Sequence, residues 1–228
     1  YKMKLEYEYS PSGLIIYLGL KDIDLTKFGF GSFNIWHQEQ WDMNKTWKDL
    51  LGGDFSKPWV FLSTPTLHTD APGTTPEGGS ILEIETLVDY QEMKDLMDKS
   101  YVDYLKRKNE IAEKLLDIVE EKFIPNLRKH IAVKVVGTTT TNEDFVMAPR
   151  GNAYGAALYP KYLKKRLFGT TPFSNFFWCN ATSGWGGVYG TTNTGMKLYS
   201  QLTGDNFYDD VTDEQLIAEL PKNYPNQF

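Results

Sequence analysis

The sequence predicts a mixed α/β (α+β) fold, in which a β-sheet and one long helix are followed by a smaller strand–turn–helix unit. Three observations support this prediction. Short apolar or alternating runs, typical of strands, recur over residues 12–88. Apolar positions at near-helical spacing then follow among charged residues over 89–123. The last third places an apolar run before a glycine-crowded turn and a helical pattern.

Four strands are expected before the long helix, over residues 12–20, 31–37, 59–64 and 80–88. The first is a nearly continuous apolar run, SGLIIYLGL, which predicts a strand buried on both faces. The last alternates, so we expect a half-buried strand with the carboxylates of Glu83 and Glu85 facing water. Turn-rich segments with several glycines and prolines separate these strands.

A long helix is expected to begin after Asp89, with Glu92 three residues on as its capping partner. Pro125 ends or bends this helix. Its apolar stripe is interpreted as core packing and consists of Met97, Tyr101, Leu105, Ala112, Leu115, Val119 and Phe123.

The remaining expected elements are a strand over residues 131–136, an apolar strand over 176–179, a helix over about 191–202 and a short helix near Thr212 and Gln215. Cys179 lies in the apolar run, which favours a buried structural thiol over a nucleophile. As the single cysteine of the chain, it excludes an internal disulfide framework. The three histidines are scattered, so no metal site is expected.

Composition places the 228-residue chain among ordinary globular proteins, with 41% hydrophobic and 24% charged residues. The formal net charge of -6 argues against nucleic acid or an anionic membrane as the main partner. No apolar run approaches the roughly 20 residues of a membrane span. We therefore expect a cytoplasmic protein, with peripheral membrane contact left open. The aromatic content of 14% fits either a large core or a long apolar ligand pocket.

The glycine-crowded turn is the strongest candidate for a binding site. Its glycines leave room for a ligand beside the backbone, and the expected helix start near Thr191 offers unpaired N–H groups and a positive dipole end. Asn180 and Thr182, at the end of the preceding apolar run, add side-chain hydrogen-bonding groups. An ordinary glycine-rich strand-to-helix connection explains the same pattern equally well.

Several segments in register resemble phytoene desaturase-like flavoproteins, the group of carotenoid desaturases, carotenoid cis–trans isomerases and retinol saturase. They are VGTTTTNE from Val136, PRGNAYG from Pro149, TTP from Thr170 and the stretch from Phe176 to Gly190. The earlier YLGL from Tyr17, GFGSFN from Gly29 and FLSTPT from Phe61 resemble substrate-domain strands of the same family. The resemblance covers the chain up to about Gly204.

The resemblance implies three regions: most of a substrate-binding domain over residues 1–145, the C-terminal part of a glutathione-reductase-type FAD domain over 146–204, and a tail with a short helix over 205–228. The dinucleotide-binding pattern G-x-G-x-x-G after an N-terminal strand does not occur in the chain. We therefore expect a C-terminal portion whose partner is a missing N-terminal FAD-binding half.

The resemblance also implies which residues bind FAD. The expected set is Gly151, Asn152, Tyr154, Gly155, Asn180, Thr182, Gly187, Tyr189, Gly190 and Thr191. Tyr154 is expected nearest the flavin ring, and no protein general base or metal ligand is assigned. Many family members have Gly-x-Asp where this chain has Asn180-Ala181-Thr182, so the aspartate that holds a flavin hydroxyl is replaced.

The implied function is that of an FAD-dependent oxidoreductase acting on a carotenoid-like polyene or other long apolar lipid, by desaturation, saturation or redox-assisted cis–trans isomerisation. In such enzymes the flavin performs the redox step and the protein binds and orients the substrate. This chain alone is expected to be inactive and to bind little FAD. The alternatives are a flavin amine oxidase-like enzyme with a polar substrate and a non-catalytic module that binds apolar ligands.

Overall fold

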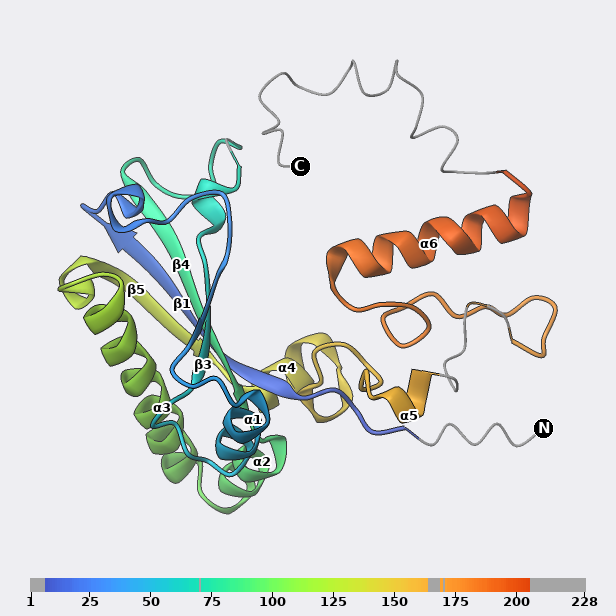
Figure 1. Cartoon of the computed structure of the whole chain (residues 1–228), viewed down its shortest axis with the longest axis horizontal. Coiled ribbons are helices and arrows are strands. Elements are labelled where there is room, and N and C mark those ends of the chain that lie inside the picture. Colours follow the sequence, from blue (N-terminus) through green and yellow to red (C-terminus); the bar gives the residue numbers. More distant parts are fainter. Residues whose placement is uncertain (1–6, 70, 164–168, 170, 206–228) are drawn as a thin grey trace. The chain divides into compact units, whose positions relative to one another are not determined.

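The computed structural model describes residues 7–69, 71–163, 169 and 171–205. These residues form two compact units (Figure 1). Tyr9–Ala153 is here called the sheet unit, and residues 7–8 together with those from Tyr154 onward are called the glycine-turn unit. The described residues contain a five-stranded sheet and six α-helices, which confirms the predicted mixed fold class. The domain limits expected at residues 145 and 204 stay predictions.

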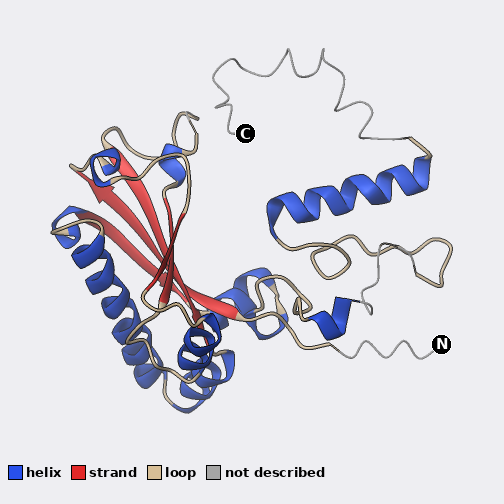
Figure 2. Ribbon diagram, in the orientation of Figure 1, coloured by secondary structure: helices blue, strands red, loops and turns tan. Residues whose placement is uncertain are grey.

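The sheet unit is built on one antiparallel sheet (Figure 2). Its strands are β1 (Ser12–Lys21), β2 (Ile35–Gln38), β3 (Trp59–Ser63), β4 (Gly79–Val88) and β5 (Ile131–Gly137). They lie in the order β2-β3-β4-β1-β5, so β4 is the middle strand. All five were expected from the sequence, but β2 begins at Ile35 and not at Gly31. Gly31 instead forms an isolated bridge with Phe33, which bends the chain before the strand starts.

One face of this sheet is buried beneath α3 (Tyr101–Lys122), which runs along the strands (Figure 1). Ile111 and Leu115 of α3 are fully buried in one cluster with Leu14 and Ile84 of the sheet. Burying each side chain of this size contributes about 2 kcal/mol. On the opposite face Tyr17 is 41% exposed. Burial of β1 on both faces was therefore wrong for the described residues, because the helices cover only one side.

The long helix expected over residues 89–123 is two helices, α2 (Tyr90–Lys99) and α3. Asp89 caps α2 as expected. Ser100 interrupts the helix with extended backbone angles (φ -160°, ψ 108°), and its hydroxyl accepts the N–H of Asp103 at 3.2 Å. The apolar residues keep their near-helical spacing across this break. The break nevertheless changes which of them face the core. Tyr101 is 59% exposed, so its assignment to the core is wrong.

Two helices of the sheet unit were not expected. α1 (Met43–Leu51) begins after Asp42, whose carboxylate accepts the N–H of Lys45 at 2.9 Å. α4 (Thr139–Val146) grows from the threonine run, where Thr138 and Thr141 form a capping box. Tyr104 of α3 fixes this start, because its hydroxyl lies 2.7 Å from Oγ1 of Thr138. Hydroxyl-rich segments of this kind start a helix when a neighbouring element satisfies the side chains.

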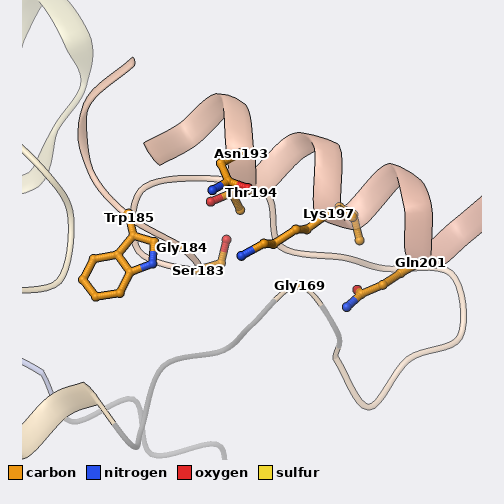
Figure 3. A pocket seen from close by; sticks show the side chains of 9 residues that line it. Gly169, Ser183, Gly184, Trp185, Asn193, Thr194, Lys197 and Gln201 are labelled. Atoms are coloured by element: carbon orange, nitrogen blue, oxygen red, sulfur yellow. The ribbon is translucent and has the colours of Figure 1, made fainter. Parts of the chain in front are cut away.

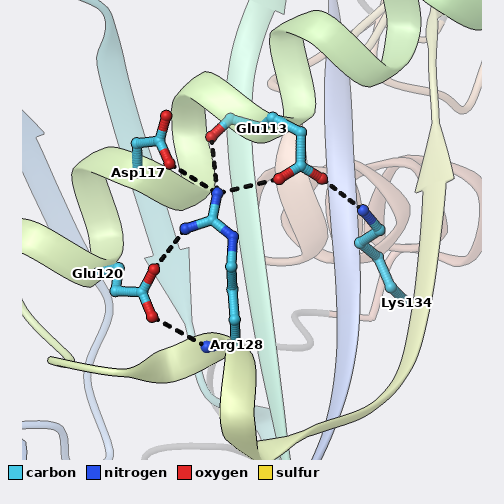
Figure 4. Close-up of polar contacts among 5 residues, drawn as sticks. All are labelled: Glu113, Asp117, Glu120, Arg128 and Lys134. Atoms are coloured by element: carbon cyan, nitrogen blue, oxygen red, sulfur yellow. Dashed lines mark hydrogen bonds and ion pairs between the residues drawn. The ribbon is translucent and has the colours of Figure 1, made fainter.

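A network of charged side chains ties α3 to the connection before β5 (Figure 4). The guanidinium of Arg128 donates to Glu113 at 3.0 Å, to Asp117 at 2.7 Å, and to Glu120. Lys134 of β5 also donates to Glu113, at 2.7 Å. These hydrogen bonds lower the pKa of the Glu113 carboxyl below its ordinary value.

Replacing Arg128 with methionine is expected to lower the free energy of unfolding of the sheet unit by about 1 kcal/mol in low salt. Three carboxylates on one helix face lose their shared cation, and salt screens the difference. Because the Glu113 pKa is lowered in the folded state, this contribution is present above the ordinary carboxyl pKa and is lost as the pH falls through the folded one. Urea titrations at pH 7 and pH 3, at low and high salt, measure it. Equal stability of the variant and the wild type at pH 7 in low salt would contradict this prediction.

The glycine-turn unit contains α5 (Pro160–Leu163) and α6 (Gly187–Thr203). The strand expected over residues 176–179 is not formed, and Cys179 is exposed, so both predictions are wrong. A strand needs a neighbour for its backbone groups, and no described segment pairs with this stretch as a ladder. α6 begins at Gly187, not at Thr191. The short helix expected near Thr212 falls outside the described residues.

Candidate functional site

The structure brings together two of the sequence segments that were expected to bind FAD. Gly155 has a left-handed backbone (φ +72°), and a Cβ added to it would lie 2.0 Å from Oγ1 of Thr182. The same hydroxyl accepts the N–H of Ala156 at 3.2 Å. Only glycine permits this approach, so the residue type at position 155 and the contact with Thr182 depend on each other.

A second contact joins the same two segments. A Cβ on Gly186 would lie 2.4 Å from Cδ1 of Tyr154, so the tyrosine ring packs directly on the backbone at that glycine. Tyr154 is nevertheless 47% exposed. One side of the ring therefore packs against Gly186, the residue before α6, and the other side is accessible.

Asn180 organises the turn that precedes α6. Its side-chain oxygen accepts the N–H of Thr182 at 2.9 Å and that of Ser183 at 3.1 Å. The hydroxyl of Ser183, itself buried, accepts the N–H of Asn180 at 3.0 Å. Both polar oxygens thus hold the loop in shape. The side-chain NH₂ of Asn180 makes no hydrogen bond within the described part of the chain and can donate to a ligand.

The amino end of α6 offers further donors. Gly186 is the N-cap, no side chain caps the helix, and no acidic residue lies in its first turn. Gly187 has a positive φ of +81° with no atom within 4 Å of an added Cβ. Tyr189 is 85% exposed. Unsatisfied N–H groups and the positive end of the helix dipole favour an anion at this position.

Two expected site residues lie deeper in the helix than the sequence indicated. Gly190 is buried, because a Cβ there would lie 2.6 Å from the carbonyl oxygen of Trp185. The hydroxyl of Thr191 donates to the carbonyl of Gly187 at 2.9 Å. Gly190 therefore permits the turn to pack on the helix, and Thr191 satisfies the first carbonyl of α6.

Gly151 and Asn152 belong to the sheet unit, in the turn η4 (Pro149–Gly151) and directly after it. Gly151 has φ +59°, and an added Cβ would lie 2.0 Å from the carbonyl oxygen of Thr139. Glu143 holds the same turn by accepting the N–H of Arg150 at 3.1 Å. These residues shape the end of the sheet unit, and their assignment to a cofactor stays a prediction.

A small pocket of about 100 Å³ lies along α6 (Figure 3). It is lined by Gly169, Ser183, Gly184, Trp185, Asn193, Thr194, Lys197, Leu198 and Gln201. None of the ten expected FAD-binding residues lines it. The sequence signal that could have found it is the spacing of Asn193, Lys197 and Gln201, which places one polar face on the helix.

The described residues show neither a metal centre nor a membrane-spanning helix. No group of three or more histidine, cysteine, aspartate or glutamate side chains among them could hold a metal ion. None of their helices combines the length and apolar character needed to cross a bilayer.

Comparison with known proteins adds evidence on ancestry. The chain is 31% identical over 120 residues to a prolycopene isomerase of Daucus carota, covering 52% of this chain and 18% of that protein. It is 24% identical over 184 residues to the all-trans-retinol 13,14-reductase of Danio rerio, covering 75% of this chain and 30% of that protein. A prolycopene isomerase of Arabidopsis thaliana is 28% identical over 176 residues, covering 74% and 25%.

The chain is a distant homologue of these proteins. This confirms the predicted resemblance to the phytoene desaturase-like group. The matches extend over only 18 to 30% of the relatives' own length. No protein-family profile matches the chain.

Proposed function

We propose that this chain is the C-terminal part of an FAD-dependent oxidoreductase that acts on a carotenoid-like polyene or another long apolar lipid. The reaction is desaturation, saturation or redox-assisted cis–trans isomerisation. The distant homology with prolycopene isomerases and a retinol reductase supports this assignment. The structural observation that supports it best is the joining of the segments at Gly155 and Thr182, and at Tyr154 and Gly186, beside the start of α6.

The residues at this place fit part of an FAD site. The uncapped amino end of the 17-residue helix α6 presents donors without a competing carboxylate, as a phosphate or ribityl group requires. Gly187 leaves its approach open, and the NH₂ of Asn180 adds a side-chain donor. In this proposal those groups hold FAD, which when bound accepts or supplies a hydride.

The chain's own residues bind and orient. Tyr154, packed on Gly186 and half-exposed, presents the exposed side of its ring to the cofactor or substrate. Thr182 and Asn180 keep the turn rigid, so that the donors at α6 need no rearrangement when the ligand binds. The side chain of Trp185 is 52% exposed. When another segment or a ligand covers its ring, the ring excludes water from the site.

The glycine-turn unit shows surfaces that another segment can cover. Gly190 is the only described residue of α6 that is fully buried, although the helix contains Val188, Tyr189 and Leu202. Among the described residues, no strand pairs with the apolar stretch of residues 176–179. Both features are expected if an N-terminal FAD-binding half supplies the neighbouring sheet and core.

The test is a flavin spectrum of the purified complete gene product that contains this chain, followed by incubation with an apolar polyene under oxidising and reducing conditions. We expect bound FAD and a changed polyene product. The 228-residue chain alone is the matched control and is expected to show no stoichiometric flavin complex. A complete protein that binds polyene without flavin would support the non-catalytic module, and turnover of amines alone would support the amine oxidase-like alternative.

A further inference from the structure

The pocket along α6 is built by close backbone contacts inside the glycine-turn unit. A Cβ on Gly184 would lie 1.8 Å from Oγ1 of Thr194, so the turn before α6 packs directly on the helix there. Gly169 has φ +75°, and a Cβ on it would lie 3.6 Å from Cδ1 of Leu198. The carbonyl of Gly169 also accepts the N–H of Trp178 at 2.9 Å. Two glycines thus bring separate backbone segments against one face of the helix.

The hydroxyl groups that line the pocket already donate their protons within the turn and the helix. Ser183 donates to the carbonyl of Asn180 at 3.1 Å, and Thr194 donates to the carbonyl of Gly190 at 2.8 Å. The ammonium group of Lys197 differs, because it makes no hydrogen bond or ion pair within the described part of the chain. Lys197 is exposed, and its amino end points toward the turn that contains Ser183 (Figure 3). This group can therefore donate to a ligand at no cost to the fold.

The pocket carries a positive charge that no described carboxylate balances. Lys197 is the single charged residue of α6, and no aspartate or glutamate lines the pocket. The other charged residues described in the glycine-turn unit have partners of their own. Nζ of Lys161 lies 2.7 Å from Oε1 of Glu8, and Asp205 accepts the hydroxyl of Tyr199 at 2.9 Å. An anion in the pocket would therefore meet an unpaired cation and no like charge among the described residues.

Apolar surface lies beside this charge. Trp185 and Leu198 line the pocket, and the ring of Trp185 is half-exposed. Asn193 and Gln201, four residues before and after Lys197, place side-chain amides on the same face of α6. At about 100 Å³ the pocket is smaller than the roughly 150 Å³ cavity that holds a benzene molecule. It therefore suits a charged group with a short apolar body.

We propose that this pocket binds a small aliphatic carboxylate, whose charge pairs with Lys197 and whose carbon chain contacts Trp185 and Leu198. An ammonium group and a carboxylate form short, charge-assisted hydrogen bonds. A neutral molecule would leave the ammonium group without a partner, and a bare inorganic anion would leave the apolar wall exposed. The inference goes beyond the proposed function, because binding at this pocket requires no flavin and none of the ten residues expected to hold it.

The first experiment titrates the isotope-labelled 228-residue chain with butyrate, with its neutral analogue butyramide and with inorganic phosphate, at constant ionic strength. NMR follows the backbone N–H of Gly184 and the indole N–H of Trp185, which both lie at the pocket. We expect butyrate to shift both signals with a Kd in the millimolar range, and the two other probes to bind at least about 10-fold more weakly. Butyramide or phosphate binding as tightly as butyrate would overturn the proposal.

The second experiment repeats the butyrate titration on Lys197→Gln, which removes the charge and keeps a polar side chain. We expect affinity to fall by about 10-fold with an unchanged far-UV circular dichroism spectrum, since Lys197 makes no described bond that holds the fold. Lys161→Gln, at the lysine that pairs with Glu8 in the same unit, is the matched control and keeps wild-type affinity. Wild-type affinity in Lys197→Gln, or butyrate shifts that leave Gly184 and Trp185 unmoved, contradicts the assignment of the site.

Two further measurements ask whether protein groups fill the pocket instead. A carbodiimide cross-link from Lys197 to an acidic residue between positions 209 and 214 would assign the pocket to the chain's own carboxylates and overturn the inference. Loss of butyrate binding in the complete gene product would do the same, because another segment would then occupy the pocket. A complete protein that binds butyrate at Lys197 but no flavin supports this inference and overturns the proposed function alone.

Discussion

Gly151→Ala is expected to lower the free energy of unfolding of the sheet unit by about 3 kcal/mol. Gly151 has φ +59°, which costs a non-glycine residue about 1–2 kcal/mol. Its new Cβ would also lie 2.0 Å from the carbonyl oxygen of Thr139 and 3.0 Å from Oγ of Ser12. The carbonyl is backbone at the start of α4 and cannot swing away, so η4 or α4 must shift.

Gly29→Ala is the matched control for this experiment. Gly29 also has a left-handed backbone, with φ +82°, but no atom lies within 4 Å of an added Cβ. We expect it to lose only the conformational term, about 1–2 kcal/mol. Urea denaturation followed by far-UV circular dichroism measures both variants in the same unit. Equal losses would show that the close approach of Gly151 to Thr139 is not a feature of the folded protein.

Leu115→Ala is expected to cost about 3 kcal/mol, because it leaves a cavity among fully buried side chains on α3. Tyr101→Ala, a larger truncation on the same helix, is expected to cost less than about 1 kcal/mol. Tyr101 is 59% exposed, and its ring stacks on that of Tyr104, with centroids 5.7 Å apart.

This pair of variants distinguishes the stability losses that the helical pattern predicts from those that the tertiary structure predicts. Both residues lie on one apolar stripe in the sequence, so the pattern alone predicts similar losses. The structure predicts a difference of at least 2 kcal/mol between the two variants, measured by the same urea titrations. A loss at Tyr101 as large as that at Leu115 would mean that Ser100 does not break the helix in solution.

The sequence by itself determined the strands of the sheet unit, the α+β class and the distant family relation. Alternating or continuous apolar runs mark β1, β3, β4 and β5 because side-chain direction along a strand has a period of two. Residue order also identified Gly155 and Thr182 as site candidates. Their individual motifs gave no indication that they touch, since Thr182 lies 26 positions beyond Ala156, the residue after Gly155.

Only the tertiary structure decided which apolar positions are buried and how far each polar side chain is exposed. Tyr101 is not in the core, because Ser100 interrupts the helix directly before it. The segment at Cys179 forms no strand, because no described neighbour pairs with it. Glu83 and Glu85 were expected to face water, but both are partly buried, and the register places Glu85 between Ile15 and Phe61. Burial and pairing depend on contacts between distant segments, and a local pattern contains no information about the neighbour that will cover it.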